Sequence, residues 1–125
     1  MKIIQVDENN QGHYSSAVIS NNMLYVSGQL GIDPVTKALP YGGIKDQTEM
    51  ALKNLDDILQ KVGSDRTSVV QCRIYISDIK HWEDVNKIYS SFFGAHKPAR
   101  IVVPVGELHY GSLVEVEAIA EMVPI

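Results

Sequence analysis

Near the C-terminus the sequence alternates between apolar and polar positions, and this pattern restricts the fold more than any other. One set of alternate positions in residues 112–122 is Val114, Val116, Ala118, Ala120 and Met122, and the other is Leu113, Glu115, Glu117, Ile119 and Glu121. Successive side chains of a β-strand point to opposite faces, so the segment predicts a strand with one apolar and one mixed face. The apolar face requires a second layer of structure to cover it.

Two segments have the spacing of amphipathic helices that can supply this layer. Apolar residues recur every three or four positions over residues 44–62, and Gly63 is a natural helix stop. The same spacing continues over residues 79–92, where Asp78 can cap the first turn and Gly94 can end the helix. We therefore expect both helices to cover the same face of the sheet.

Short apolar or alternating runs predict the other strands. They span residues 17–19, 23–29, 69–76 and 99–105, with an additional short strand at residues 2–6. The first two runs are separated by Ser20-Asn21-Asn22, whose short polar side chains suit a tight hairpin turn. The order of these elements predicts an α+β fold, in which a mixed β-sheet has two α-helices packed on one face.

Length and composition set the class of protein. With 125 residues, 45% of them hydrophobic, the chain is long enough for one domain, residues 1–125, with a sizeable core. Its formal net charge of −4 gives no extended cationic surface for nucleic acid.

The lone Cys72 and the scattered histidines give no metal-binding motif, so we expect no metal site. The first residues are too polar for a signal peptide or a membrane span, which predicts a cytoplasmic protein with no membrane partner.

The second face of the predicted sheet is mixed in character. Strand parity places on it Tyr25, Ser27, Gln71, Arg73, Tyr75, Arg100 and Val102, opposite a face with Val70, Cys72, Ile74 and Ile76. An antiparallel sheet with one wet face is common. Tyrosines, aliphatic residues and balanced charges together also fit a face buried in an oligomer, and this is the interpretation we favour.

Arg100 and Glu115 are the residues that best fit a chemical role. If residues 106–111 join two neighbouring antiparallel strands, the midpoint near residue 108 places Arg100 opposite residue 115 or 116. An arginine in a poorly hydrated cleft is a good receptor for a small carboxylate, because its planar fork donates two parallel hydrogen bonds. A neighbouring carboxylate can orient a water. From spacing alone, a structural ion pair between the two strands is the more frequent arrangement.

Short motifs along almost the whole chain carry a resemblance to a known family. They are Gly12-His13-Tyr14-Ser15-Ser16-Ala17-Val18, Val26-Ser27-Gly28-Gln29, Asp33-Pro34-Val35-Thr36, Gln47-Thr48, Ala51-Leu52-Lys53-Asn54-Leu55, Asn86-Lys87-Ile88-Tyr89-Ser90-Ser91-Phe92-Phe93, Pro98-Ala99-Arg100 and Val114-Glu115-Val116-Glu117-Ala118-Ile119-Ala120. In this order and at this spacing they resemble the RidA (YjgF) family of reactive enamine/imine deaminases.

The resemblance implies a chorismate-mutase-like fold that assembles as a homotrimer, with a central β-barrel and clefts between the subunits. It implies a cofactor-independent 2-iminobutanoate/2-iminopropanoate deaminase. Such a hydrolase converts 2-imino acids, for example 2-iminopropanoate formed from 2-aminoacrylate, to 2-keto acids and ammonia. A small 2-imino or 2-keto acid would be its ligand, and neither a metal ion nor an organic cofactor would be needed.

The resemblance also assigns roles to individual residues. Arg100 matches the arginine that grips the substrate carboxylate, and Glu115 matches the glutamate associated with the attacking water. The other substrate-binding positions that it implies are Tyr14, Ser27, Gly28 and Asn86. An aromatic residue packed between subunits is an equally good interpretation of Tyr14, and a structural hydroxyl is an equally good interpretation of Ser27.

Two positions depart from the family pattern. His13 stands where the family usually has proline, and Ile101 stands where it usually has a small residue after the arginine. Strand parity predicts that Ile101 faces the helices, so these departures affect the expected substrate range more than the reaction type. Two other functions stay open: a non-enzymatic carboxylate-binding regulator or scaffold, and RNA cleavage, which the acidic net charge disfavours.

Overall fold

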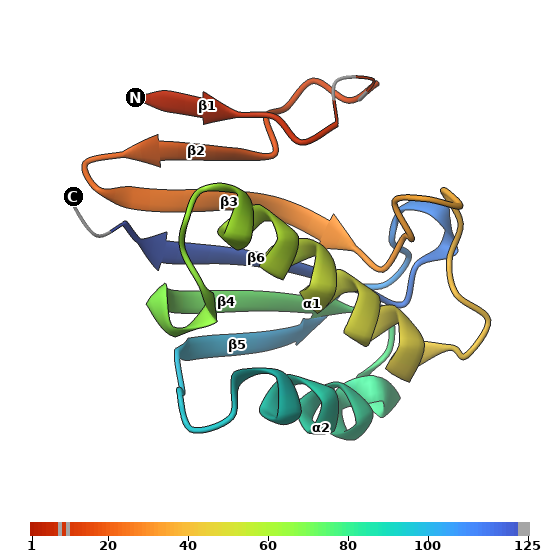
Figure 1. Cartoon of the computed structure of the whole chain (residues 1–125). Coiled ribbons are helices and arrows are strands. Elements are labelled where there is room, and N and C mark those ends of the chain that lie inside the picture. Colours follow the sequence, from red (N-terminus) through yellow and green to blue (C-terminus); the bar gives the residue numbers. More distant parts are fainter. Residues whose placement is uncertain (8, 10, 123–125) are drawn as a thin grey trace.

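Figure 1 shows the computed structural model of the chain, which describes residues 1–7, 9 and 11–122. The strands are β1 (Lys2–Ile4), β2 (Ala17–Ser20), β3 (Met23–Leu30), β4 (Val69–Ile76), β5 (Ala99–Pro104) and β6 (Val114–Glu121). The helices are α1 (Ile44–Lys61) and α2 (Trp82–Phe93), with short 3₁₀ turns η1 (Arg66–Ser68), η2 (Ile79–His81) and η3 (His109–Gly111). Each predicted strand and helix is present, although β1 ends earlier than predicted and α2 begins only after a separate 3₁₀ turn.

The strands form one mixed sheet in the order β1-β2-β3-β6-β4-β5. The predicted hairpin joins β2 to β3, and both Asn21 and Asn22 have positive φ, as a two-residue type I′ turn requires. β6 runs antiparallel between β3 and β4. β5 pairs parallel with β4, because α2 carries the chain back to the starting end of the sheet before β5 begins.

Both helices lie on one face of the sheet, as predicted (Figure 1). The alternate positions of β6 that are buried under them are Val114, Val116, Ala118 and Ala120, each at most 4% exposed. The inner face of α1 completes this core with Ala51, Leu52, Leu55, Ile58 and Leu59. Gly63 has a φ of 77° and follows the end of α1, which confirms the predicted helix stop. In the described part of the chain, neither helix has the length and apolar character needed to cross a membrane.

The two closing strands are not neighbours, so the predicted pairing of Arg100 with Glu115 is wrong. β4 lies between them: Arg100 is paired with Cys72, whereas Glu115 is paired with Tyr75. The error arose because a short connection suggested a hairpin. The crossover through α2 instead places β5 on the outer side of β4.

The predicted parity of β5 is also wrong. Arg100 and Val102 lie beside the buried residues Cys72 and Ile74, so they are on the helix-covered face. Ile101 is on the open face and is 52% exposed. A strand's parity depends on which residues it pairs with, and for β5 that pairing is non-local.

A bulge in β4 accounts for one further misplaced residue. The β4–β6 register shifts between Val69 and Gln71. Val69 is therefore buried, at 1% exposed, whereas Val70 is 41% exposed, although the sequence pattern places Val70 on the apolar face. Beyond the bulge the predicted alternation is confirmed.

Helix α1 holds the end of β3 and the start of β6 in place. A Cβ atom added at Gly31 would lie 2.3 Å from the carbonyl oxygen of Gln47, so strand and helix pack here with no side chain between them. Oε1 of Gln47 accepts a hydrogen bond of 2.8 Å from the backbone N–H of Leu113, just before β6. Nδ2 of Asn54 donates to the carbonyl oxygen of Leu30 at the end of β3, at 3.0 Å. These contacts hold the strands that carry several predicted site residues.

Gly31→Ala should lower the free energy of unfolding by about 1–3 kcal/mol, because the new methyl group overlaps a backbone atom that cannot move without shifting α1. Urea unfolding at a fixed protein concentration, followed by circular dichroism, measures the change. A glycine with open space around it would instead gain about 0.4–1 kcal/mol on this substitution. Unchanged or increased stability would therefore contradict the close packing of Gly31 against α1.

Candidate functional site

Glu115 lies in β6 on the open face of the sheet, next to an irregular point of β3. The β3–β6 register shifts between Val26 and Gln29, so β3 bulges at Ser27 and Gly28. A Cβ atom added at Gly28 would lie 2.5 Å from Oε2 of Glu115. The Glu115 carboxylate therefore packs directly on the backbone of Gly28, and a larger residue at that position would displace it.

The segment that carries Tyr14 is fastened to the same bulge. The Ser27 hydroxyl donates to the carbonyl oxygen of Ser15 at 2.6 Å, and the Ser27 N–H donates to the carbonyl oxygen of Ser16 at 3.0 Å. The Tyr14 side chain is 55% exposed. The Ser27 hydroxyl thus has a structural role, because it holds the segment of Tyr14 on β3. We call Tyr14, Ser27, Gly28 and Glu115 the Glu115 group.

The surroundings of Glu115 favour its protonated form. Partial burial raises the pKa of this carboxyl above its ordinary value, the negative charge of Glu117 raises it further, and His109 opposes the shift. Glu117 itself accepts a hydrogen bond from the Tyr75 hydroxyl at 2.5 Å and pairs with Arg73 at 3.5 Å. A carboxylate with a raised pKa is a stronger base than a fully solvated one, which suits it to accepting a proton from water.

Arg100 lies at the sheet edge, in contact with α2. Its Nη1 donates a hydrogen bond of 2.8 Å to Oδ1 of Asn86. Its guanidinium carbon lies 4.8 Å from the ring centroid of Tyr89 and 5.6 Å from that of Trp82. Among the described residues, no Asp or Glu oxygen lies within 4.0 Å of its side-chain nitrogens. Arg100 is therefore a half-buried cation that no carboxylate in the described part of the chain neutralises. We call Arg100 and Asn86 the Arg100 group.

The two groups are too far apart to act on one small molecule within a single chain. Arg100 lies beside Cys72 and Glu115 lies beside Tyr75, three residues further along β4, which corresponds to about 10 Å. The two side chains also belong to opposite faces of the sheet, because residues three apart in a strand alternate in direction. The structure thus brings the predicted site residues together as two clusters, not as one.

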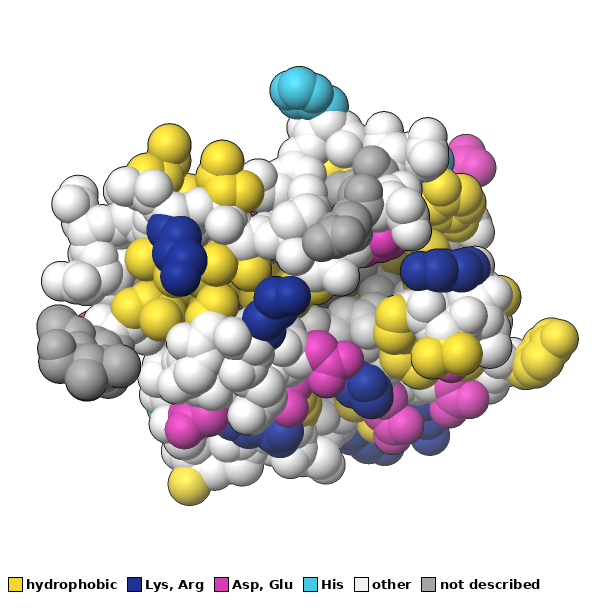
Figure 2. Space-filling model, turned by 45° about the horizontal axis from the view of Figure 1, so that its top comes forward, with side chains coloured by type: hydrophobic (Ala, Val, Ile, Leu, Met, Phe, Trp, Pro, Cys, Tyr) yellow, Lys and Arg dark blue, Asp and Glu magenta, His cyan; other side chains and the backbone are white. Residues whose placement is uncertain are grey.

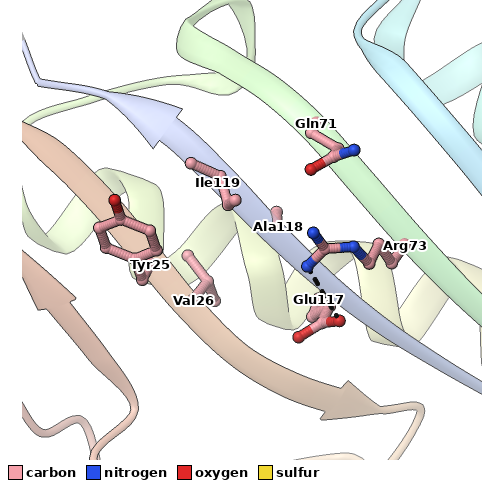
Figure 3. Close-up of a pocket in the computed structure, with 7 residues that line it drawn as sticks. All are labelled: Tyr25, Val26, Gln71, Arg73, Glu117, Ala118 and Ile119. Carbon is pink, nitrogen blue, oxygen red and sulfur yellow. Dashed lines mark ion pairs between the residues drawn. The ribbon is translucent and has the colours of Figure 1, made fainter.

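A small cavity of about 70 Å³ lies on the open face and contains neither Arg100 nor Glu115. Its lining residues are Tyr25, Val26, Gln71, Arg73, Glu117, Ala118 and Ile119 (Figure 3). The ion pair between Arg73 of β4 and Glu117 of β6 lies across it. The cavity is too small to enclose a metabolite, since ligand pockets usually measure about 300–1,000 Å³.

A larger groove of about 510 Å³ lies where β1 and β2 approach the end of α1. Its lining residues are Lys2, Ile3, Ile4, Gln5, Ile19, Lys61, Val62 and Met122. Figure 2 shows hydrophobic side chains gathered with cationic ones on the left of the molecule. The groove contains none of the predicted site residues. Within the residues that the structure describes, no three His, Cys, Asp or Glu side chains are grouped so that they could bind a metal ion.

Trp82 and Tyr89 are parts of the Arg100 environment that sequence reasoning missed. Their spacing in α2 predicts core positions, and Tyr89 is indeed only 6% exposed, whereas Trp82 is 36% exposed. Their rings nevertheless lie against the guanidinium of Arg100. The sequence did contain a pattern that could have predicted this arrangement. Trp82 lies four residues before Asn86 and Tyr89 lies three residues after it, so all three side chains share one face of the helix.

Sequence comparison gives the family. The family model described as Endoribonuclease L-PSP matches residues 6–122. The 2-iminobutanoate/2-iminopropanoate deaminase of Rattus norvegicus is 42% identical over 113 residues, which are 90% of this chain and 82% of that protein. The Homo sapiens protein of the same name is 40% identical over 114 residues, 91% of this chain and 83% of that protein.

Solved structures agree with this assignment. YyfA of Yersinia pestis, described as a member of the Rid protein family, is 39% identical, with a TM-score of 0.87 over 90% of each chain. E. coli TdcF with bound serine is 28% identical, with a TM-score of 0.91 over 98% of this chain and 100% of that chain. The mixed sheet with two helices on one face is the chorismate-mutase-like fold shared by these proteins, and the chain belongs to the RidA (YjgF) family.

Proposed function

We propose that this protein is a cofactor-independent 2-iminobutanoate/2-iminopropanoate deaminase. The observation that carries the proposal is Arg100, a half-buried cation held by Asn86 and left without an acidic partner among the described residues, and so free to bind a substrate carboxylate. The rat and human relatives named for this activity support it. The serine bound to TdcF, an amino acid with a carboxylate, supports a ligand of this class.

The working site would lie between two copies of the chain. Arg100 and Glu115 belong to opposite faces of the sheet, so one chain cannot bring both to the same substrate. In a homotrimer with a central β-barrel, the Arg100 group of one subunit would meet the Glu115 group of the next. Tyr25 and Ile101, which are 46% and 52% exposed on the open face, are apolar surface that such an assembly would bury.

The proposed reaction needs water as its second reactant. Arg100 would bind the substrate carboxylate with two hydrogen bonds. This would place the electrophilic carbon of the protonated imine against the Glu115 group. Glu115 would orient a water and accept its proton as the oxygen attacks that carbon. Glu115 would then return this proton to the carbinolamine nitrogen and take up the hydroxyl proton as the C–N bond breaks, which releases ammonia and leaves the 2-keto acid. Tyr14, Ser27 and Gly28 would form the wall beside the attacking water.

The other functions have weaker support. A regulator that only binds carboxylates would need Arg100, but it would not need Glu115, whose pKa is raised and whose side chain packs on Gly28. Side chains with shifted pKa values are concentrated at reactive sites. RNA cleavage appears in the description of the family model, but the net charge of −4 argues against an extended phosphate-binding surface. A cytoplasmic location remains an expectation from the sequence.

Arg100→Ala should lower kcat/KM for freshly generated 2-iminopropanoate by about 100-fold, because a charge-assisted bidentate contact is lost. Ammonia release is measured in a coupled assay, in which a dehydratase supplies the imine, against the rate in buffer alone. Lys97→Ala removes an exposed cation three residues away and should leave the rate unchanged. If the unaltered protein did not accelerate imine hydrolysis but still bound 2-ketobutyrate in calorimetry, the regulator would replace the enzyme.

Mixed assemblies test the shared site. Arg100→Ala and Glu115→Gln chains should each be nearly inactive alone, but purified mixed trimers should recover about a third of the normal activity, since one of the three subunit contacts in a mixed trimer joins an intact Arg100 to an intact Glu115. Two affinity tags allow the mixed species to be purified before the assay. A mixture of two differently tagged Arg100→Ala chains is the control. Mixed trimers without recovered activity would contradict a site shared between subunits.

The pH dependence should follow Glu115. A general base works only when deprotonated, so kcat/KM should fall on the acid side, with a midpoint above the value of about 4.3 for a solvated glutamate, because burial and Glu117 raise its pKa. Glu115→Gln should remove this acid limb from the residual activity and cost about 10²–10⁴-fold in rate. The buffer rate is subtracted at each pH, since the imine also hydrolyses without protein. An unchanged acid limb in Glu115→Gln would assign the titration to another group.

A further inference from the structure

We infer that Tyr89 and Trp82 are positioning residues, whose ring faces hold the Arg100 guanidinium in the orientation that receives a carboxylate. The inference rests on the proposed function for the identity of the substrate. It concerns residues to which neither the sequence pattern nor the comparisons assign a role at the site.

The geometry places Arg100 within a cage built from one face of α2. Trp82, Asn86 and Tyr89 are spaced four and three residues apart, so they lie along the same side of the helix. Asn86 accepts one hydrogen bond from the guanidinium, while the rings of Tyr89 and Trp82 lie 4.8 and 5.6 Å from its carbon. Both distances are within the range of cation–π attraction. α2 thus holds the cation in three ways at once.

Each group named around the guanidinium is neutral. Burial raises the pKa of the Cys72 thiol, which lies beside Arg100 on the neighbouring strand, to about 11, so the thiol stays protonated. Burial raises the pKa of Tyr89 as well. A carboxylate in place of these groups would fix the arginine equally well but would neutralise it. A cage of rings and an amide fixes the side chain and leaves its charge for the substrate.

The ring of Tyr89, not its hydroxyl, is the part that acts on Arg100. Tyr89 is 6% exposed, and its hydroxyl is buried with no hydrogen bond of good geometry among the described residues. The ring also packs on Phe93, with centroids 4.7 Å apart, so its orientation is fixed by the core. Preorganised side chains lose less conformational freedom when a ligand binds, which increases affinity.

Three substitutions separate the ring from the hydroxyl and from general packing. Tyr89→Phe keeps the ring and should leave KM for the imine, and Kd for 2-ketobutyrate, within about twofold of normal. Tyr89→Leu removes the ring face and should raise KM for the imine and Kd for 2-ketobutyrate by about five- to tenfold, with a much smaller change in kcat. Phe93→Leu removes the ring that packs on Tyr89 but keeps both rings that lie over Arg100, so it should change KM and Kd by less than about twofold, far less than Tyr89→Leu does.

Trp82→Leu provides a second test if Tyr89→Leu does not fold. Trp82 is 36% exposed and contributes less to the core, and its ring is farther from the guanidinium. We expect KM and Kd to rise by about two- to threefold. Equal effects of Phe93→Leu and Tyr89→Leu on KM, or normal constants in both Tyr89→Leu and Trp82→Leu, would overturn the inference.

A measurement that does not depend on turnover distinguishes this inference from the proposed function. The chain has three arginines, Arg66, Arg73 and Arg100, so the Nε–Hε signals of ¹⁵N-arginine-labelled protein can be assigned by substitution. Tyr89→Leu should move the Arg100 signal toward that of a free arginine. Arg66, which lies over Phe92 at 3.9 Å, should be unaffected and serves as the internal control.

The proposed function and the cage around Arg100 can be contradicted separately. If the protein binds 2-ketobutyrate but does not hydrolyse imines, the proposed function fails, while the Arg100 signal and the Kd still test the cage. If the protein is an active deaminase and Tyr89→Leu leaves the Arg100 signal and Kd unchanged, the cage alone is wrong.

Discussion

The parallel pairing of β5 with β4 decides what Arg100 can do. This pairing sets Arg100 beside Cys72 and turns its side chain to the helix-covered face, where α2 meets it with Asn86 and two aromatic rings. One residue of slip would exchange Arg100 for Ile101 and direct the cation to the open face. The crossover helix that places β5 in the sheet is thus also the element that holds the arginine.

A second constraint acts on the other side of β4, where Glu115 of β6 packs on the backbone of Gly28 in β3. The bulge in β3 turns Ser27 and Gly28 out of the regular ladder, and the missing side chain at Gly28 leaves room for the carboxylate. The same bulge fastens the segment of Tyr14 through the two hydrogen bonds of Ser27. Close packing on a backbone removes water from the carboxylate, which accounts for the direction of its pKa shift.

Local patterns predicted the parts of this structure that depend on local forces. The Asn21-Asn22 turn, the two helix faces and the stop at Gly63 depend on residues close in sequence, and each is confirmed. The side on which Arg100 lies could not be obtained this way, because it depends on a partner strand almost thirty residues earlier. The family motifs predicted a set of site residues but not their division between two faces.

This division separates two properties of the proposed enzyme. Affinity for the carboxylate would depend on α2 and β5, where the cage keeps a cation unneutralised, whereas the chemical step would depend on the bulge of β3 and on β6. Ile101 is a neighbour of Arg100 in sequence but lies on the open face, so its bulk would act on the contact between subunits and not on the carboxylate receptor. His13, next to Tyr14, lies in the segment tied to Ser27 and would act on the wall beside the attacking water. The two departures from the family pattern therefore concern different parts of the proposed site, and neither is one of the residues that form the cage around Arg100.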